Sequence, residues 1–120
     1  MLMQFGEFIF KENPAKLHLK RNRKLTLINI SETVELVQNR GRMARVAEGE
    51  GVFLGQNALE EFKKLTTMFD SNEEAKMLVL PHKEMFWAYF SKLLLVGSGM
   101  DWAKYTFEFV EDCLKGGDLQ

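Results

Sequence analysis

The chain has 120 residues, 46% of them hydrophobic and 28% charged, and its formal net charge is -1. The length suits one domain with one core, and the composition excludes the disordered and fibrous classes. A charge so close to neutral excludes a global electrostatic attraction to nucleic acid or to an anionic membrane.

The first third of the chain shows the patterns of strands joined by turns. Residues 3–10 alternate with period 2, which predicts a half-buried strand. Asn13 and Pro14 predict a turn, because proline fixes its own φ and disfavours helix in the residue before it. Residues 16–30 alternate leucine with polar residues and predict a second strand. Its polar stretch 21–24 is either the wet edge of that strand or the tip of a hairpin.

The middle of the chain carries glycines inside a strand pattern. Residues 33–37 predict a short strand, and residues 39–41 predict a turn, because asparagine and glycine tolerate positive φ. Residues 42–55 then alternate as a strand in which Gly49 and Gly51 share one phase. Two glycines at such positions predict either a bulge or a close approach of another backbone.

The clearest helix is predicted over about residues 57–69. Asn57 can cap its free N–H groups, with Glu60 three residues later as in a capping box. Apolar residues at spacings of three and four form a predicted core stripe of Leu59, Phe62, Leu65, Met68 and Phe69. The predicted outer face carries Glu60, Glu61, Lys63 and Lys64.

The last third is again strand-like. Residues 70–74 predict a polar loop, and strands are predicted over 76–80, 85–96 and 105–110. Glycines and an aspartate over 97–101 predict the hairpin loop between the last two strands.

These elements predict an α+β fold, with a β-barrel-like or sandwich antiparallel sheet and one main inserted helix. We expect a single β-rich domain over residues 1–115 and a frayed tail over 116–120. The N-terminus lacks the basic start and long apolar centre of a secretory signal, and no apolar run reaches the roughly 20 residues that span a bilayer. The lone Cys113 cannot form an internal disulfide. We therefore expect synthesis and folding in the cytoplasm, with no membrane partner.

No catalytic or metal-binding constellation is evident. His18 has no acid at a ligand spacing, and His82 follows a strand-ending proline, so we expect exposed structural roles for both. Glu48 and Glu50 share a strand face and could act as acid and base or hold a divalent cation, although a solvated face is the commoner case. No phosphate-binding glycine motif is present. We expect no enzyme activity, no cofactor and no bound metal.

Two features could serve as contact surfaces. Residues 16–24 carry the densest positive charge, which could meet phosphates or dock an acidic protein. The aromatic residues of the last third are explained by core packing first and by a protein interface second, because Trp and Tyr are favoured interface anchors. The interface candidates are Lys20, Arg21, Arg23, Lys24, Gly49, Gly51, Phe53, Trp87, Tyr89 and Trp102.

The order of the segments resembles a known family. The segments are FGEFIFKENPAKLHL, then GRMARVAEGEGVFLGQNALEEFKKLTTMF, then MLVLP and the closing YTFEFVED. Over residues 3–112 they resemble small tail and baseplate proteins, the tube-to-hub adaptors of contractile phage tails and of phage-tail-like bacteriocins of Gram-positive bacteria. The most telling piece is the GEGVFLG stretch followed directly by the capped helix.

The resemblance implies a structural component that joins tail tube, hub and baseplate through protein–protein contacts. The implied partners are tail tube and hub proteins, with the tape measure protein as a further one, in an oligomeric ring. The implied location is the cytoplasm of the producing bacterium during assembly, and then the virion or tail-like particle. No catalytic residues carry over. Larger relatives append a peptidoglycan-binding domain that this chain lacks, so we expect no contact with the cell wall.

A second hypothesis from another class comes from the residues alone. A stand-alone β-barrel module could bind nucleic acid or another polyanion through the basic stretch 16–24.

Overall fold

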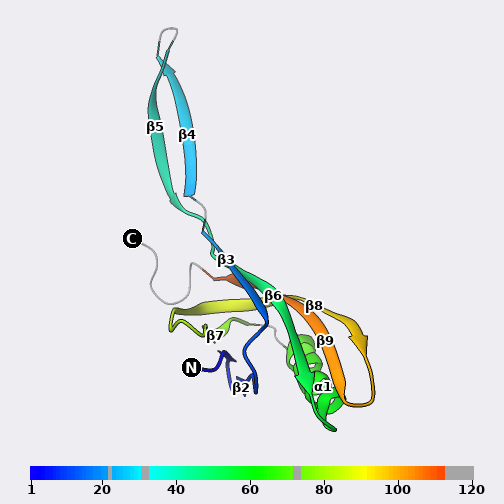
Figure 1. Ribbon diagram of the computed structural model, residues 1–120. Coiled ribbons are helices and arrows are strands. Elements are labelled where there is room, and N and C mark those ends of the chain that lie inside the picture. Colours follow the sequence, from blue (N-terminus) through cyan, green and yellow to red (C-terminus); the bar gives the residue numbers. More distant parts are fainter. Residues whose placement is uncertain (22, 31–32, 72–73, 113–120) are drawn as a thin grey trace.

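The computed structural model describes residues 1–21, 23–30, 33–71 and 74–112, and for residues 23–30 and 33–42 it describes the backbone alone. This described part holds nine strands and one helix (Figure 1). The strands are β1 (Gln4–Phe5), β2 (Phe8–Ile9), β3 (Lys16–Lys20), β4 (Arg23–Ile30), β5 (Thr33–Arg42), β6 (Val46–Leu54), β7 (Lys76–Val79), β8 (Met85–Ser98) and β9 (Trp102–Glu111), and the helix is α1 (Ala58–Ser71). Cys113 and the predicted tail 116–120 lie outside the described residues.

Seven of these strands form one antiparallel sheet, in the order β2-β1-β7-β8-β9-β6-β3. The sheet curls, because the ring of Phe5 on β1 lies 4.7 Å from the ring of Phe109 on β9 although β7 and β8 separate the two strands. Its edges are β2 and β3, and a two-residue β2 is too short to form a closing ladder. The predicted α+β class with an antiparallel sheet and one inserted helix is confirmed, whereas closure into a barrel is wrong.

The core fills the inner side of this curl. On β9 the residues Tyr105, Phe107 and Phe109 are buried, and the residues between them face outward. The rings of Phe90 and Phe109 lie 4.5 Å apart. Helix α1 covers the same side against β6, β8 and β9 and adds the fully buried Leu65. Aromatic burial of this kind is a main source of stability in a small domain.

Strands β4 and β5 form a separate two-stranded sheet, called the arm below, which projects away from the body of the molecule (Figure 1). The chain measures 66 × 27 × 26 Å and its radius of gyration is 18.0 Å, against about 14 Å for a compact domain of this length. Pairing of β3 with β6 ends at Lys20 opposite Val46, and pairing of β4 with β5 starts at Arg23 opposite Arg42. The arm is thus the upper half of one long hairpin, with an interruption at its base.

Two of the turn predictions fail because of the arm. The hairpin-tip alternative for residues 21–24 is wrong, since Arg23 and Lys24 already belong to β4, which pairs with β5. Residues 39–41 lie inside β5 instead of forming a turn. The register there passes from Arg23 to Leu25 on β4 but from Arg42 to Asn39 on β5, so β5 holds one extra residue. This is a bulge, which suits glycine as well as a turn does.

Glycines account for two further differences from the predictions. The single strand expected over residues 3–10 is a hairpin of β1 and β2, because Gly6 takes a φ of 59° and turns the chain. Strand β6 pairs with β3 and β9 without a register shift, so the predicted bulge is wrong. The close approach is confirmed, because a Cβ on Gly49 would lie 2.1 Å from the carbonyl oxygen of Lys16.

Helix α1 confirms the predicted helix, with its end shifted to Ser71. Leu65 is buried as predicted, and Phe62, Met68 and Phe69 pack against the core. Two assignments are wrong, since Leu59 is 40% exposed and Glu61 only 8% exposed. Lys11 lies over the first turn and pairs with Glu61 at 2.5 Å, which explains why a charged residue is tolerated there.

Candidate interaction surfaces

An ion cluster lies at the base of the arm. Arg45, directly before β6, donates from Nε and Nη2 to the two carboxylate oxygens of Glu111, at 3.0 and 2.8 Å. Its backbone N–H also donates to Glu111, at 3.0 Å. The Glu111 side chain is 1% exposed, and the Arg45 guanidinium lies 4.4 Å from the ring centroid of Phe86. The hydrogen bond to Glu111, which outweighs burial, raises the pKa of Arg45, as expected for a bidentate charge-assisted pair.

Glu84, in the turn between β7 and β8, completes this cluster. One of its carboxylate oxygens accepts from Arg45 Nη1 at 2.5 Å, and the other accepts from Arg21 and lies 3.0 Å from His82 Nε2. Partial burial alone would raise the pKa of Glu84, but the hydrogen bonds from His82, Arg45 and Arg21 outweigh it and lower the pKa to about 2. The four residues Arg21, Arg45, Glu84 and Glu111 are called the root cluster below.

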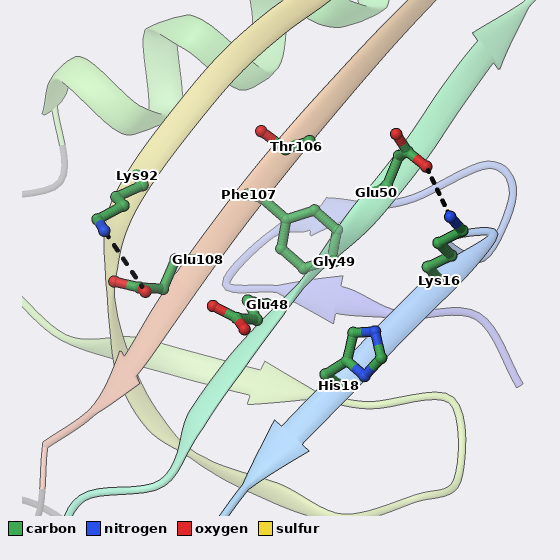
Figure 2. Close-up of a pocket in the computed structure, with 9 residues that line it drawn as sticks. All are labelled: Lys16, His18, Glu48, Gly49, Glu50, Lys92, Thr106, Phe107 and Glu108. Carbon is green, nitrogen blue, oxygen red and sulfur yellow. Dashed lines mark ion pairs between the residues drawn. The ribbon is translucent and has the colours of Figure 1, made fainter.

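The outer face of β3, β6, β9 and β8 carries rows of charged side chains (Figure 2). One row runs through the register from His18 to Glu48, Glu108 and Lys92. Like charges directly opposite each other destabilise a sheet, so the two glutamates need compensation. Lys20 lies 2.7 Å from Glu48, and its hydrogen bond lowers the pKa of that carboxyl, while Lys92 lies 3.9 Å from Glu108.

A shallow groove of about 390 Å³ lies along this row, and its lining also includes Lys16, Gly49, Glu50, Thr106 and Phe107 (Figure 2). Lys16 and Lys104 lie 3.9 and 3.3 Å from the carboxylate of Glu50. The charges of this face are therefore largely paired with one another. The geometry is that of a solvated, ion-paired sheet face, as the sequence suggested for Glu48 and Glu50.

Apolar side chains gather instead near the turn between β8 and β9. Leu54 lies opposite Trp102 in the register, and both are exposed, as are Val96 and Met100. Trp102 is held over Gly99, where a Cβ would lie 2.2 Å from the indole Nε1. Leu54, Val96, Met100 and Trp102, called the distal patch below, are thus exposed apolar residues near one turn, and larger exposed apolar surfaces mark protein interaction sites.

The fold is similar to one seen in a phage protein. Among solved structures, SPP1 Dit (gp 19.1) matches with a TM-score of 0.66 at 10% sequence identity. Its structure is described as a paradigm of the hub adsorption apparatus in phages that infect Gram-positive bacteria. The match covers 92% of this chain and 49% of SPP1 Dit, so this chain spans about half the length of that protein. At this identity the likeness shows the fold.

Sequence comparisons add no relative to this structural likeness. No protein-family model matches the chain, and no curated protein does.

The structure separates the predicted aromatic candidates into inner and outer groups. Phe53 is 5% exposed and stacks on Tyr105 with ring centroids 4.8 Å apart, so the folded chain offers no surface there. Tyr89 and Trp102 are exposed, and the Tyr89 hydroxyl donates to Asp112 at 3.2 Å. Trp87 is half-buried. An interface role for the outer aromatic residues stays a prediction.

The predicted basic stretch is divided between two structures. Lys20 pairs with Glu48 on the sheet, and Arg21 pairs with Glu84 in the root cluster. Arg23 and Lys24 belong to β4 in the arm. The stretch therefore does not form one continuous ribbon on a single sheet.

Sequence reasoning missed Arg45, Glu84 and Glu111. Only Glu111 left a signal, because it continues the buried phase of Tyr105, Phe107 and Phe109, and a charged residue in that phase requires a partner.

Within residues 1–21, 23–30, 33–71 and 74–112, no three His, Cys, Asp or Glu side chains are placed to hold a metal ion. In the same part of the chain, no helix has the length and hydrophobicity to cross a bilayer.

Gly49→Ala is expected to lower the free energy of unfolding by roughly 1–2 kcal/mol, because its Cβ would force β3 away from β6. Gly97→Ala is the matched control, since a Cβ there would meet only the Trp102 ring at 3.3 Å. Urea unfolding of both variants measures the difference. Equal stability of the two would contradict the close approach at Gly49.

Proposed function

We propose that this chain is a structural component of a phage tail, within the hub that carries the adsorption apparatus. The observation that supports the proposal is the fold likeness to SPP1 Dit over 92% of this chain. Because one fold can serve many functions, the surfaces of this chain provide the second line of support.

The arm favours a role in assembly. In the described backbone β4 pairs with β5 and with no strand of the larger sheet, so each has an outer edge of unpaired backbone groups. A lone two-stranded hairpin is at best marginally stable in water, and open edges accept further strands. A neighbouring tail subunit that pairs with the arm would stabilise it by strand addition.

The exposed residues of the distal patch offer a second contact surface. The turn between β8 and β9 lies at the opposite end of the molecule from the arm (Figure 1). Two different surfaces at opposite ends allow head-to-tail contacts, which close into rings when the rotation between subunits permits. We propose that the working form is such a ring, in contact with tail tube and hub proteins and with the tape measure protein as a further neighbour. The chain would be assembled in the cytoplasm of the producing bacterium and would end in the virion.

Several finer expectations stay predictions. They are the contractile tail type, the bacteriocin particle and the absence of enzyme activity. The alternative, a polyanion-binding module, has less support, because Lys16, Lys20 and Arg21 each pair with a carboxylate of the same chain.

Removal of the arm tests the proposal. Residues 23–42 would be replaced by Asn-Gly, two residues that favour a turn, so that a short loop joins the last β3–β6 pair, Lys20 with Val46. We expect the shortened chain to keep the unfolding temperature of the body, because the described core residues belong to the larger sheet, helix α1 and the segments that join them. In a producing strain that lacks the original gene, we expect at least a tenfold drop in complete tails, counted by electron microscopy.

A C-terminal tag on the full-length chain is the control in the same strain. Gold labelling at one end of the tails is the expected result. If the full-length protein were never found on tails, the proposed tail function would be contradicted. If the shortened chain gave a normal number of tails, the proposed role of the arm in assembly would be contradicted.

A further inference from the structure

The two strands that pass from the sheet into the arm each carry an arginine at the crossing point. Arg21 follows β3 directly, and Arg45 precedes β6 directly. Both arginines bind the same carboxylate, that of Glu84 in the turn between β7 and β8. The two connections to the arm are thereby joined through a residue that belongs to neither of them.

The backbone ladder is interrupted at this point. The last pair below it is Lys20 with Val46, and the first pair above it is Arg23 with Arg42. Two residues separate the pairs on one strand (21 and 22) and three on the other (43 to 45), so the interruption is uneven. A ladder that stops and restarts gives little resistance to bending, and an unpaired joint of this kind can act as a hinge.

Glu84 lies in a turn whose backbone is closed by hydrogen bonds. The N–H of Leu80 donates to the carbonyl of Glu84 at 2.8 Å, and the N–H of Lys83 donates to the carbonyl of Leu80 at 2.8 Å. These bonds close a tight turn in which Lys83 takes a φ of 77°. The second anchor is Glu111 on β9, which binds Arg45 through two side-chain bonds and one backbone bond.

We propose that the root cluster is a latch that sets the direction of the arm relative to the sheet, with Glu84 as its central residue. Arg45 fixes one connection to β9 and to the β7–β8 turn, and Arg21 fixes the other connection to the same turn. The benefit of the latch for partner binding rests on the proposed function. An arm that is already held in one direction loses less conformational entropy when a partner binds. The direction itself is a property of the isolated chain.

Electron–electron distance measurements on the purified chain test the latch. One spin label would replace Gln38 on β5 and the other Thr67 on α1, in a Cys113→Ser background. We expect a narrow distance distribution for the otherwise unchanged chain. Arg21→Gln and Glu84→Gln are expected to widen it at least twofold, while Arg21→Lys keeps it narrow because the ion pair is retained.

Glu48→Gln is the matched control, since it removes an ion pair from the same long hairpin but below the interruption. Arg21 is 55% exposed, so its replacement leaves the core intact and the result remains interpretable if Glu84→Gln loses stability. The latch would be overturned if the distance distribution kept its width in Arg21→Gln and Glu84→Gln. It would also be overturned if the original chain already had a distribution as wide as the variants. Neither result bears on whether the chain belongs to a tail.

Discussion

Arg45→Gln is expected to lower the free energy of unfolding by about 3–5 kcal/mol, the usual cost of removing one partner of a buried ion pair. Glu111 would keep its negative charge at a site where its side chain is 1% exposed. It would lose the two guanidinium bonds and retain the bond from the backbone N–H of residue 45. The guanidinium would also no longer cover the ring of Phe86.

Urea unfolding at pH 7 measures this loss. Lys20→Gln is the matched control, because it removes a cation that pairs with a glutamate at 2.7 Å on the open face of the same hairpin. A much smaller loss is expected there, since exposed pairs are screened by water. If the two variants lost similar stability, the root cluster would contribute no more than a surface ion pair. A double variant of Arg45→Gln with Glu111→Gln should recover part of the loss, because the buried carboxylate that has lost the guanidinium is then replaced by a neutral amide.

The elements with strong periodicity were predictable from the sequence. Helix α1 and strands β7, β8 and β9 lie close to the predicted ranges, because each has one face that the core must bury. In β9 the alternation from Tyr105 to Phe109 also identifies the buried face correctly. The same reasoning fails for Glu61, because the partner that allows its burial, Lys11, comes from a distant part of the chain.

The arm was not predictable, for a physical reason. Alternating residues predict that a strand pairs with another, but the pattern is the same whether the pair joins a large sheet or stands apart. The interruption after Lys20 looks like any short polar stretch. What separates the arm from the sheet is the absence of a third strand beside it in the described backbone, which is a property of the whole topology.

The root cluster was hidden for a related reason. Arg21, Arg45, Glu84 and Glu111 come from four separate segments, and only the register of the finished sheet brings them together. From the sequence alone, the basic stretch 16–24 predicts a surface for an outside partner. Among the described side chains of this stretch, Lys20 pairs with Glu48 and Arg21 with Glu84, both within the chain. Compensation between neighbouring strands therefore explains much of this charge without a ligand.

Acid is expected to remove the contribution of Glu84 to stability. The pKa of Glu84 is lowered from its ordinary 4.5 to about 2 in the folded chain. A lowered folded-state pKa gives stability that is fully present above pH 4.5 and is lost as the pH falls toward 2. The shift corresponds to about 2–3 kcal/mol, with allowance for screening at a side chain that is 17% exposed.

The difference in free energy of unfolding between the original chain and Glu84→Gln isolates the contribution of Glu84 from that of the other carboxyl groups. Urea unfolding at several pH values between 7 and 2.5 should show a difference of about 2–3 kcal/mol at neutral pH that shrinks steadily below pH 4.5. Glu48→Gln should show a smaller difference at pH 7, because its carboxylate lies with Lys20 on the open outer face. A difference for Glu84→Gln that stays constant down to pH 2.5 would mean that shape or packing, and not charge, makes this residue stabilising. In that case the latch at the base of the arm would not depend on ion pairs, and Arg21→Gln should then leave the arm in place.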